Sequence, residues 1–187
     1  MTSPFPKAYA DFVQRLRVPA GFILLGGFVL LAHPTAISIL NSLPVIFLGL
    51  ALRAWAAGHL EKNQNLAISG PYAYTRNPLY LGTLIVAAGF CVAANDPWLP
   101  FLFAAIFFLI YIPVMYEESA HLTKLFSGYA AYAQGVPLLV PRLTAWTQAT
   151  KRFSWGLFWR NKEQKAWYGA LAGLALLAGK MQFLRYD

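Results

Sequence analysis

The sequence has little charge. Asp, Glu, Lys and Arg make up only 12% of its 187 residues, whereas about a quarter of a typical soluble domain is charged. Hydrophobic residues make up 58%, so too few polar side chains remain to cover the surface of a soluble protein. These proportions exclude an ordinary soluble globular domain and indicate an integral membrane protein.

Cysteine and acidic residues are also scarce. Cys91 is the single cysteine, which excludes an intramolecular disulfide and a metal site with several thiolates. Seven acidic residues stand against 15 Lys and Arg, for a net charge of +8. The basic residues lie mostly between hydrophobic runs, where membrane orientation and anionic headgroups explain them. We therefore expect anionic membrane lipids as partners of the basic tail, and no nucleic acid.

Four long hydrophobic runs cover residues 18–32, 37–57, 79–94 and 98–116. A helix needs about 20 apolar residues to cross the hydrocarbon, so the runs suffice once interfacial residues are added. Residues 1–17 have the spacing of an amphipathic surface helix, and residues 166–179 form a fifth apolar run that crosses only if the helix continues through 184. The sequence predicts an all-α integral membrane protein with four to five transmembrane helices and an N-terminal amphipathic helix.

We treat residues 1–187 as a single domain with an interfacial helix (1–17), a membrane core (18–134) and a basic, aromatic tail (135–187). The short turns at His33 and Asn95 contain no Lys or Arg. With four crossings, nine basic residues fall on the other side: Lys7, Arg15, Arg17, Lys62, Arg76, Lys124, Arg142, Lys151 and Arg152. This asymmetry predicts a cytoplasmic N-terminus, a cytoplasmic 58–77 loop and a cytoplasmic C-terminal half. The first run lacks a convincing cleavage site, so we expect it to stay in the mature protein.

The segment 69–78, "SGPYAYTRNP", stands at the entrance to the third run. Pro at the first helical position and Asn77 as N-cap favour a helix start, and Arg76 beside that start offers positive potential. Glu117 and Glu118 end the fourth run, where the negative end of a helix favours cations, so a positive partner is expected. Opposite potentials on the same side of the membrane suit a zwitterionic ligand.

Other ionisable residues have plainer interpretations. Arg53 near the end of the second run either reaches up to the headgroups or pairs with an anionic ligand. His121 follows Glu118 by three residues, which is half of a Glu-x-x-His pattern. A di-metal bundle site needs two copies of that pattern, so we predict no metal.

The motif "SGPYAYTRNPLYLG" is followed about 35 residues later by "EE", then by Tyr129, Tyr132 and "VP" at 136–137. This combination resembles the isoprenylcysteine carboxyl methyltransferase family, which includes the phospholipid N-methyltransferases and many bacterial members. The resemblance covers residues 43–141. Asn77 stands where His is usual, and Leu125–Phe126 stands where Phe-Gly is common.

The resemblance implies a helical membrane enzyme that transfers a methyl group from S-adenosylmethionine to a lipophilic acceptor carrying a carboxylate, amine or thiol. It also implies a cytoplasmic cofactor pocket, here in a bacterial inner membrane, with the acceptor entering from the bilayer. Arg76 and Glu118 are the expected catalytic residues, with Glu118 accepting from the ammonium or a ribose hydroxyl. The residues expected to bind or frame the cofactor are Tyr72, Arg76, Asn77, Tyr80, Gly82, Glu117, Glu118, Tyr129 and Tyr132.

Two alternatives remain open. Membrane sterol reductases share a loosely similar entrance motif and use NADPH, but no basic cluster suited to a 2′-phosphate is evident outside the interfacial tail. A non-catalytic, lipid-binding relative is the second alternative, against which the intact entrance motif and acid pair count. Binding of labelled NADPH or S-adenosylmethionine would separate them.

Overall fold

The computed structural model describes residues 5–146 and 151–186, where the regular secondary structure is helical and no β-strand occurs. The α-helices are α1 (Lys7–Leu31), α2 (Ala36–Ala57), α3 (Pro78–Ala94), α4 (Trp98–Ile106), α5 (Ile112–Leu125), α6 (Tyr129–Gly135), α7 (Trp155–Arg160) and α8 (Gln164–Tyr186). A 3-10 helix, η1 (Gly70–Ala73), and a π-helix, η2 (Phe107–Tyr111), complete the set. The predicted all-α class is confirmed.

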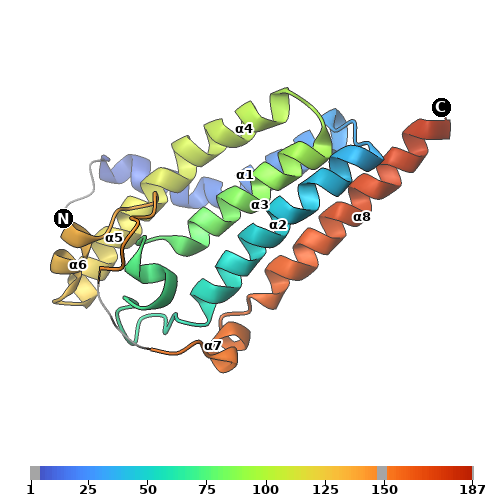
Figure 1. Cartoon of the computed structure of the whole chain (residues 1–187). Helices are drawn as coiled ribbons and strands as arrows, with labels where there is room; N and C mark the ends of the chain where they lie inside the picture. The colour runs from blue at the N-terminus through green and yellow to red at the C-terminus, as the bar shows by residue number, and fades with distance from the viewer. Residues whose placement is uncertain (1–4, 147–150, 187) are drawn as a thin grey trace.

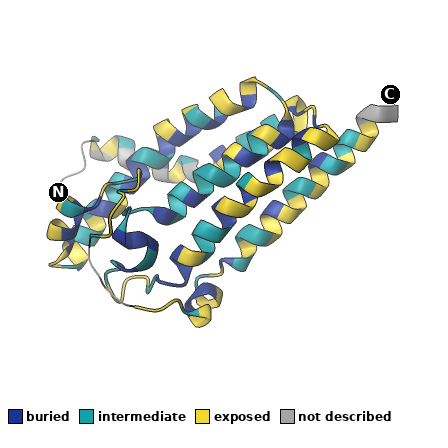
Figure 2. Ribbon diagram, viewed as in Figure 1, coloured by how far each residue is buried: buried dark blue, intermediate teal, exposed yellow. Residues whose placement is uncertain are grey.

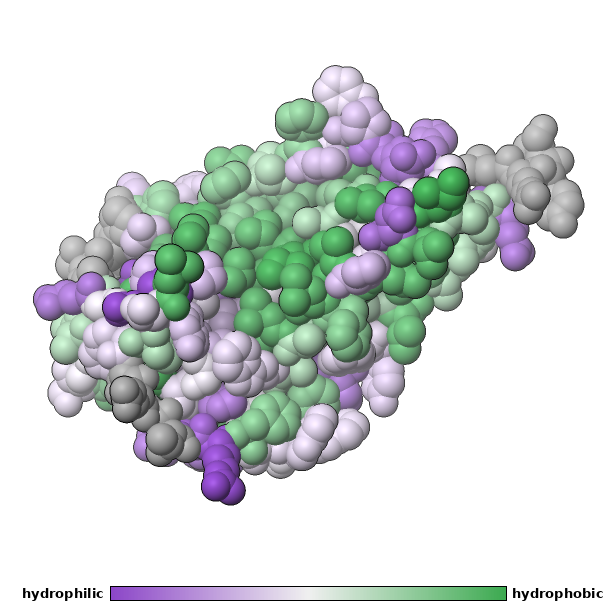
Figure 3. All heavy atoms as spheres, in the orientation of Figure 1, coloured by the Kyte–Doolittle hydropathy of each residue, from purple (hydrophilic) through white to green (hydrophobic). Residues whose placement is uncertain are grey.

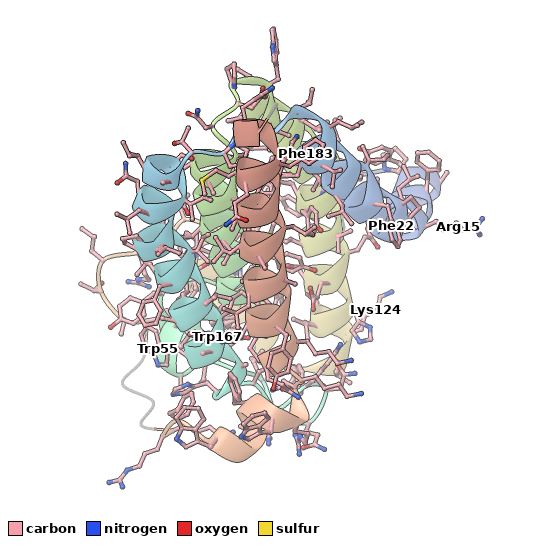
Figure 4. The ribbon with its side chains drawn as sticks, turned by 90° about the vertical axis from the view of Figure 1, so that its right-hand side faces the viewer. Arg15, Phe22, Trp55, Lys124, Trp167 and Phe183 are labelled. Carbon is pink, nitrogen blue, oxygen red and sulfur yellow. The ribbon has the colours of Figure 1, made fainter. Side chains whose placement is uncertain are left out.

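The long helices lie side by side along an elongated bundle (Figure 1). The loop after α2, the end of α5, and α6 and α7 gather at one end. Trp55 and Lys124 lie toward that end and Phe183 lies at the opposite one (Figure 4). We call the first end the loop end. The loop end carries residues 69–78, which we call the entrance segment, and therefore positions the candidate site.

The outer surface of the bundle is apolar. Two helices are long and apolar enough to cross a membrane, α2 and the continuous stretch Trp98–Leu125, and Pro19–Leu31 and Pro78–Ala94 are shorter apolar helices. Green, hydrophobic side chains cover the middle of the face in Figure 3, with polar residues toward its ends. The outward faces of the helices are exposed while their inward faces are buried (Figure 2). A membrane protein is supported, and the count of four to five crossings stays a prediction.

Helix α1 joins two segments that the sequence suggested as separate. It runs without a break from Lys7 to Leu31 and contains Pro19, so no boundary falls at residue 18. Arg15 and Phe22 point away from the other helices (Figure 4). Residues 1–4 of the predicted amphipathic helix lie outside the described residues.

The fourth hydrophobic run continues well beyond its last apolar residue. Helix α5 extends to Leu125, so Glu117 and Glu118 lie about two turns before its end. The prediction that this acid pair sits at a helix C-terminus is therefore wrong, and the macrodipole is not the field that acts on it. Residues after the acid pair are mostly good helix formers, which carry the helix out of the apolar zone.

A proline explains the π-helix within this long helix. Pro113 has no N–H and cannot bond to the carbonyl four residues earlier, that of Leu109. The hydroxyl of Tyr9 on α1 donates to that carbonyl instead, at 2.6 Å. The wider turn of η2 sets the direction of Tyr111, and such turns are frequent at functional sites.

Glycines bring α2 and α3 into close contact. A Cβ on Gly82 would lie 2.5 Å from Cγ of Arg53 and 2.8 Å from the carbonyl oxygen of Gly49. A Cβ on Gly89 would lie 2.6 Å from Cγ1 of Ile46. We call this contact, with Gly49, Gly82 and Gly89, the glycine seam. Backbones this close leave no room for any larger residue.

The tail returns along the bundle. Asn161 donates its side-chain amide to the carbonyls of Ala57 and Leu60, both at 2.9 Å, which fixes the turn between α7 and α8 against the end of α2. Helix α8 then runs beside α2 (Figure 1). The helix predicted over 166–184 is present, and its crossing of the membrane stays a prediction.

Candidate functional site

The entrance segment is held from two directions. Gly70 has φ +57°, a conformation that favours glycine, and a Cβ there would lie 2.8 Å from the ring of His59. The chain after α6 runs beside the segment: Arg76 N–H donates to the carbonyl of Pro137 at 2.9 Å, and Arg142 N–H donates to that of Tyr74 at 3.0 Å. The backbone around Arg76 is thus fixed before any ligand binds.

Asn77 also bonds the entrance segment to the chain that follows α6. It occupies the N-cap position of α3, but its side chain caps no helix N–H; its Nδ2 donates to the carbonyl of Leu138 at 2.9 Å. The hydroxyl of Thr75 donates to the neighbouring carbonyl of Leu139, also at 2.9 Å. The predicted capping bond of Asn77 is therefore wrong, because the segment after α6 takes its amide. The amide oxygen remains free to face the cavity.

A cavity of about 570 Å³ opens between the 60–67 loop, the start of α3, α5 and α6. Its size lies within the range of about 300–1,000 Å³ usual for small-molecule sites. Seven of the nine predicted cofactor residues line it: Tyr72, Arg76, Asn77, Tyr80, Glu118, Tyr129 and Tyr132. We call it the polar cavity. The entrance segment and one of the two acids thus meet in one space.

Two opposite charges face the polar cavity without a protein counter-charge. Nε of Arg76 is buried and has no hydrogen-bond partner among the described residues. Glu118 accepts a hydrogen bond from the hydroxyl of Tyr80 at 3.2 Å. Over residues 5–146 and 151–186, neither Glu117 nor Glu118 forms an ion pair. A buried donor of this kind is costly unless a ligand satisfies it.

Glu117 and Gly82 lie outside the polar cavity. Glu117 lines a more open neighbouring pocket of about 510 Å³, which shares Tyr80, Glu118 and His121 with the polar cavity. Of the two acids only Glu118 also lines the polar cavity, because adjacent side chains on a helix point about 100° apart. Gly82 faces α2 in the glycine seam, so its missing side chain serves helix packing.

Tyr129 and Tyr132 form a buried wall of the polar cavity, each 1% exposed. The Tyr132 hydroxyl donates to the carbonyl of Tyr72 at 2.8 Å, and the rings of Tyr129 and Tyr132 meet edge to face with centroids 5.8 Å apart. Burial raises the pKa of Tyr72 and of Tyr132 above the ordinary tyrosine value. Both hydroxyls therefore stay protonated at neutral pH, and that of Tyr132 acts as a donor.

Tyr132→Phe is expected to destabilise the protein by about 1–2 kcal/mol, because the buried carbonyl of Tyr72 loses its donor. Tyr129→Phe is the matched control, since the Tyr129 hydroxyl makes no hydrogen bond among the described residues; we expect it to change stability by less than about 0.5 kcal/mol. Thermal unfolding in detergent measures both. Equal losses in the two variants would contradict the assigned bond.

An ion pair that the sequence did not reveal holds Arg53, which lines the polar cavity, in place. Arg53 donates from Nε and Nη2 to the two carboxylate oxygens of Glu163, at 2.6 and 3.0 Å. Its Nη1 donates to the hydroxyl of Thr83 at 2.5 Å. Arg53 thus pairs with a protein carboxylate, a partner that neither earlier interpretation named, and it also lines the polar cavity. The available signal was that Glu163 is the single acid among residues 142–165.

A second cavity, of about 1,030 Å³, lies among α1, α3, α4, η2 and α8. Its walls are apolar except near Lys180 and where it shares Thr83 and Tyr111 with the polar cavity. We call it the apolar groove. Sequence reasoning missed both shared residues, for which a Thr and a Tyr within apolar runs were the only signals.

Metal ligands do not gather in the described part of the chain, where no three His, Cys, Asp or Glu side chains lie close enough to hold an ion. The predicted absence of a metal stays a prediction.

Comparison with known proteins bears on this site. The sequence model of the phospholipid methyltransferase family matches residues 36–128, about half of the chain. Over these residues the chain belongs to the phospholipid methyltransferase family. The resemblance drawn from the sequence is thereby confirmed. The family region runs from α2 to just beyond α5, and so includes every predicted site residue except Tyr129 and Tyr132.

Two curated relatives are similar to this phospholipid methyltransferase family member. The cobalt-zinc-cadmium resistance protein CzcN of Cupriavidus metallidurans is 30% identical over 123 residues, which is 64% of this chain and 57% of that protein. The nickel-cobalt-cadmium resistance protein NccN of Alcaligenes xylosoxydans xylosoxydans is 26% identical over 137 residues, 72% of this chain and 63% of that protein. The chain thus spans about three fifths of each relative's length. No solved structure matches it.

Proposed function

We propose that this phospholipid methyltransferase family member transfers a methyl group from S-adenosylmethionine to a lipophilic acceptor. One observation carries the proposal: Arg76 and Glu118, of opposite charge and without ion-pair partners among the described residues, face one cavity that meets an apolar groove at Thr83 and Tyr111. Such a site suits a charged donor on one side and an apolar acceptor on the other.

The residues of the polar cavity fit this cofactor. The free Nε of Arg76 would bind its carboxylate, and Glu118, held by Tyr80, would bind its ammonium. Tyr129 and Tyr132 would exclude water from the buried side. When bound, the cofactor would supply a methyl group whose carbon a nucleophile attacks in line, as the carbon–sulfur bond breaks and its electron pair leaves on sulfur.

The acceptor would be oriented where the two cavities meet. The Thr83 hydroxyl is itself fixed, because it donates to the carbonyl of Leu79 at 2.9 Å and accepts from Arg53. Alignment of reactants in such a site supplies about 7–11 kcal/mol in favourable systems. A carboxylate acceptor needs no base, whereas an amine or thiol must lose a proton, which Glu117 or Glu118 would take.

The same proposal includes the orientation predicted from the basic residues. The loop end carries Lys62, Arg142 and Lys151, so it would face the cytoplasm in a bacterial inner membrane, with four to five helices crossing. Trp155 and Trp159 on α7 are exposed beside basic residues, which suits contact with anionic headgroups. The cofactor would then enter from the cytoplasm and the acceptor from the bilayer.

Incubation of the detergent-solubilised protein with methyl-labelled S-adenosylmethionine and fractionated membrane lipids tests the function. We expect label in a lipid fraction. Binding of the cofactor without transfer to any fraction would support a non-catalytic relative, and binding of labelled NADPH in its place would support a reductase. Either result overturns the proposal.

A further inference from the structure

The apolar groove has about the length of one lipid chain. Its wall on α8 runs from Ala172 to Phe183, which is roughly 16 Å at 1.5 Å per residue. That length is close to half of the hydrocarbon core, which is about 30 Å thick. The wall that α8 contributes is thus about as long as one leaflet is thick.

A cation bridges two helices near the far end of the groove. Nζ of Lys180 on α8 donates to the carbonyls of Val29 and Leu30 on α1, at 2.7 and 3.2 Å. These carbonyls belong to the last turn of α1, whose partial negative charge favours a cation. Helices α1 and α8 are thus tied together at the end opposite the polar cavity, and Phe183 lies near that end of α8 (Figure 4).

We propose that the apolar groove holds a single hydrocarbon chain of the acceptor and selects acceptors by chain length, a proposal that rests on the function proposed above. Continuity with the polar cavity identifies the occupant. A chain in the groove ends at Thr83 and Tyr111, where its polar head meets the methyl donor. The bridge from Lys180 limits the chain at the other end. A single-chain amphiphile of the cytoplasmic leaflet satisfies these conditions.

This assignment makes α8 the specificity element. Helix α8 lies outside the part of the chain that matches the family model, yet it forms one whole wall of the groove. The bonds that hold the start of α8, from Arg53 to Glu163, also fix Thr83 at the reactive end. Chain selection and acceptor orientation thus depend on the same helix.

Two glycines of α8 provide a matched test. Gly179 lines the groove, and a Cβ there would meet no atom within 4 Å, so the position has room for a larger side chain at the groove wall. Gly169 also has nothing within 4 Å of a Cβ but does not line the groove. Both changes replace glycine in a helix, which favours the fold in each case.

Methyl transfer is measured with labelled S-adenosylmethionine and homologous series of alkyl carboxylates, alkylamines and alkylthiols of increasing chain length. Gly179→Leu should lower kcat/KM for the longest active members by about tenfold or more, while the shortest members and the Kd of the cofactor stay unchanged. Gly169→Leu should leave the whole profile unchanged. Lys180→Ala should raise the relative activity toward the longest chains, because it removes the closing bridge.

Transfer by all variants with the chain-length profile of the natural protein would overturn this inference alone. Equal methylation of a two-chain phosphatidylethanolamine by the natural protein and by Gly179→Leu would also overturn it. Absence of transfer by the natural protein to any acceptor would instead overturn the proposed function.

Discussion

Glu118→Gln should weaken the binding of S-adenosylmethionine by about 10- to 100-fold, as expected for loss of a charge-assisted hydrogen bond of about 1.5–3 kcal/mol. The change keeps the shape of the side chain and its bond from Tyr80, but removes the negative charge of the polar cavity. Equilibrium dialysis with labelled cofactor in detergent gives the Kd directly.

Glu117→Gln is the matched control. It makes the same chemical change one residue earlier, but Glu117 lines the neighbouring pocket and not the polar cavity. We expect its Kd to stay within about threefold of the natural protein, the range of a screened surface charge. Equal weakening by both variants would show that net charge near the membrane governs binding, and the assigned pocket would then be wrong.

Glu163→Leu should destabilise the protein by about 3 kcal/mol, because it leaves Arg53 charged at a site from which water is largely excluded. For a chain of this size each kcal/mol corresponds to about 2–4 °C in Tm. Thermal unfolding in detergent should therefore show a drop of several degrees. Methyl transfer should fall as well, since Arg53 holds the Thr83 hydroxyl.

A second change separates the charge effect from lost packing. Arg53→Met combined with Glu163→Leu should recover most of the lost stability, because no buried charge remains. Lys151→Ala serves as the surface control: Lys151 pairs with Glu61 at 2.7 Å in an exposed position, and its loss should cost less than about 1 kcal/mol. Failure of the double variant to regain stability would assign the effect to packing.

The sequence carried the parts of the fold that depend on local signals. The hydrophobic runs located α2 and α3 to within a residue, because their ends coincide with turns rich in Pro, Asn and Gly. The end of α5 could not be found in this way. Hydrophobicity stops near Tyr116, but helix propensity alone continues the helix to Leu125.

In the candidate site, too, residues marked by local sequence signals could be predicted, whereas long-range contacts could not. Arg76 and Glu118 were recognisable because each stands beside a motif or at the end of an apolar run. The pairing of Arg53 with Glu163 joins residues 110 positions apart, and the bond from Asn77 to Leu138 spans 61. Contacts over such separations depend on how helices dock, which local pattern does not encode.

The glycine seam has a consequence for turnover. Helices whose backbones touch cannot slide or part without opening a void along their whole contact, so α2 and α3 behave as one rigid plate. Arg53 lies on α2 and Thr83 on α3, so we expect the distance between their side chains to stay the same when a ligand binds. With the cofactor bound as proposed, a gate that admits it would therefore belong to the 60–67 loop, where residues 62–65 are exposed and Asn63 has a left-handed backbone.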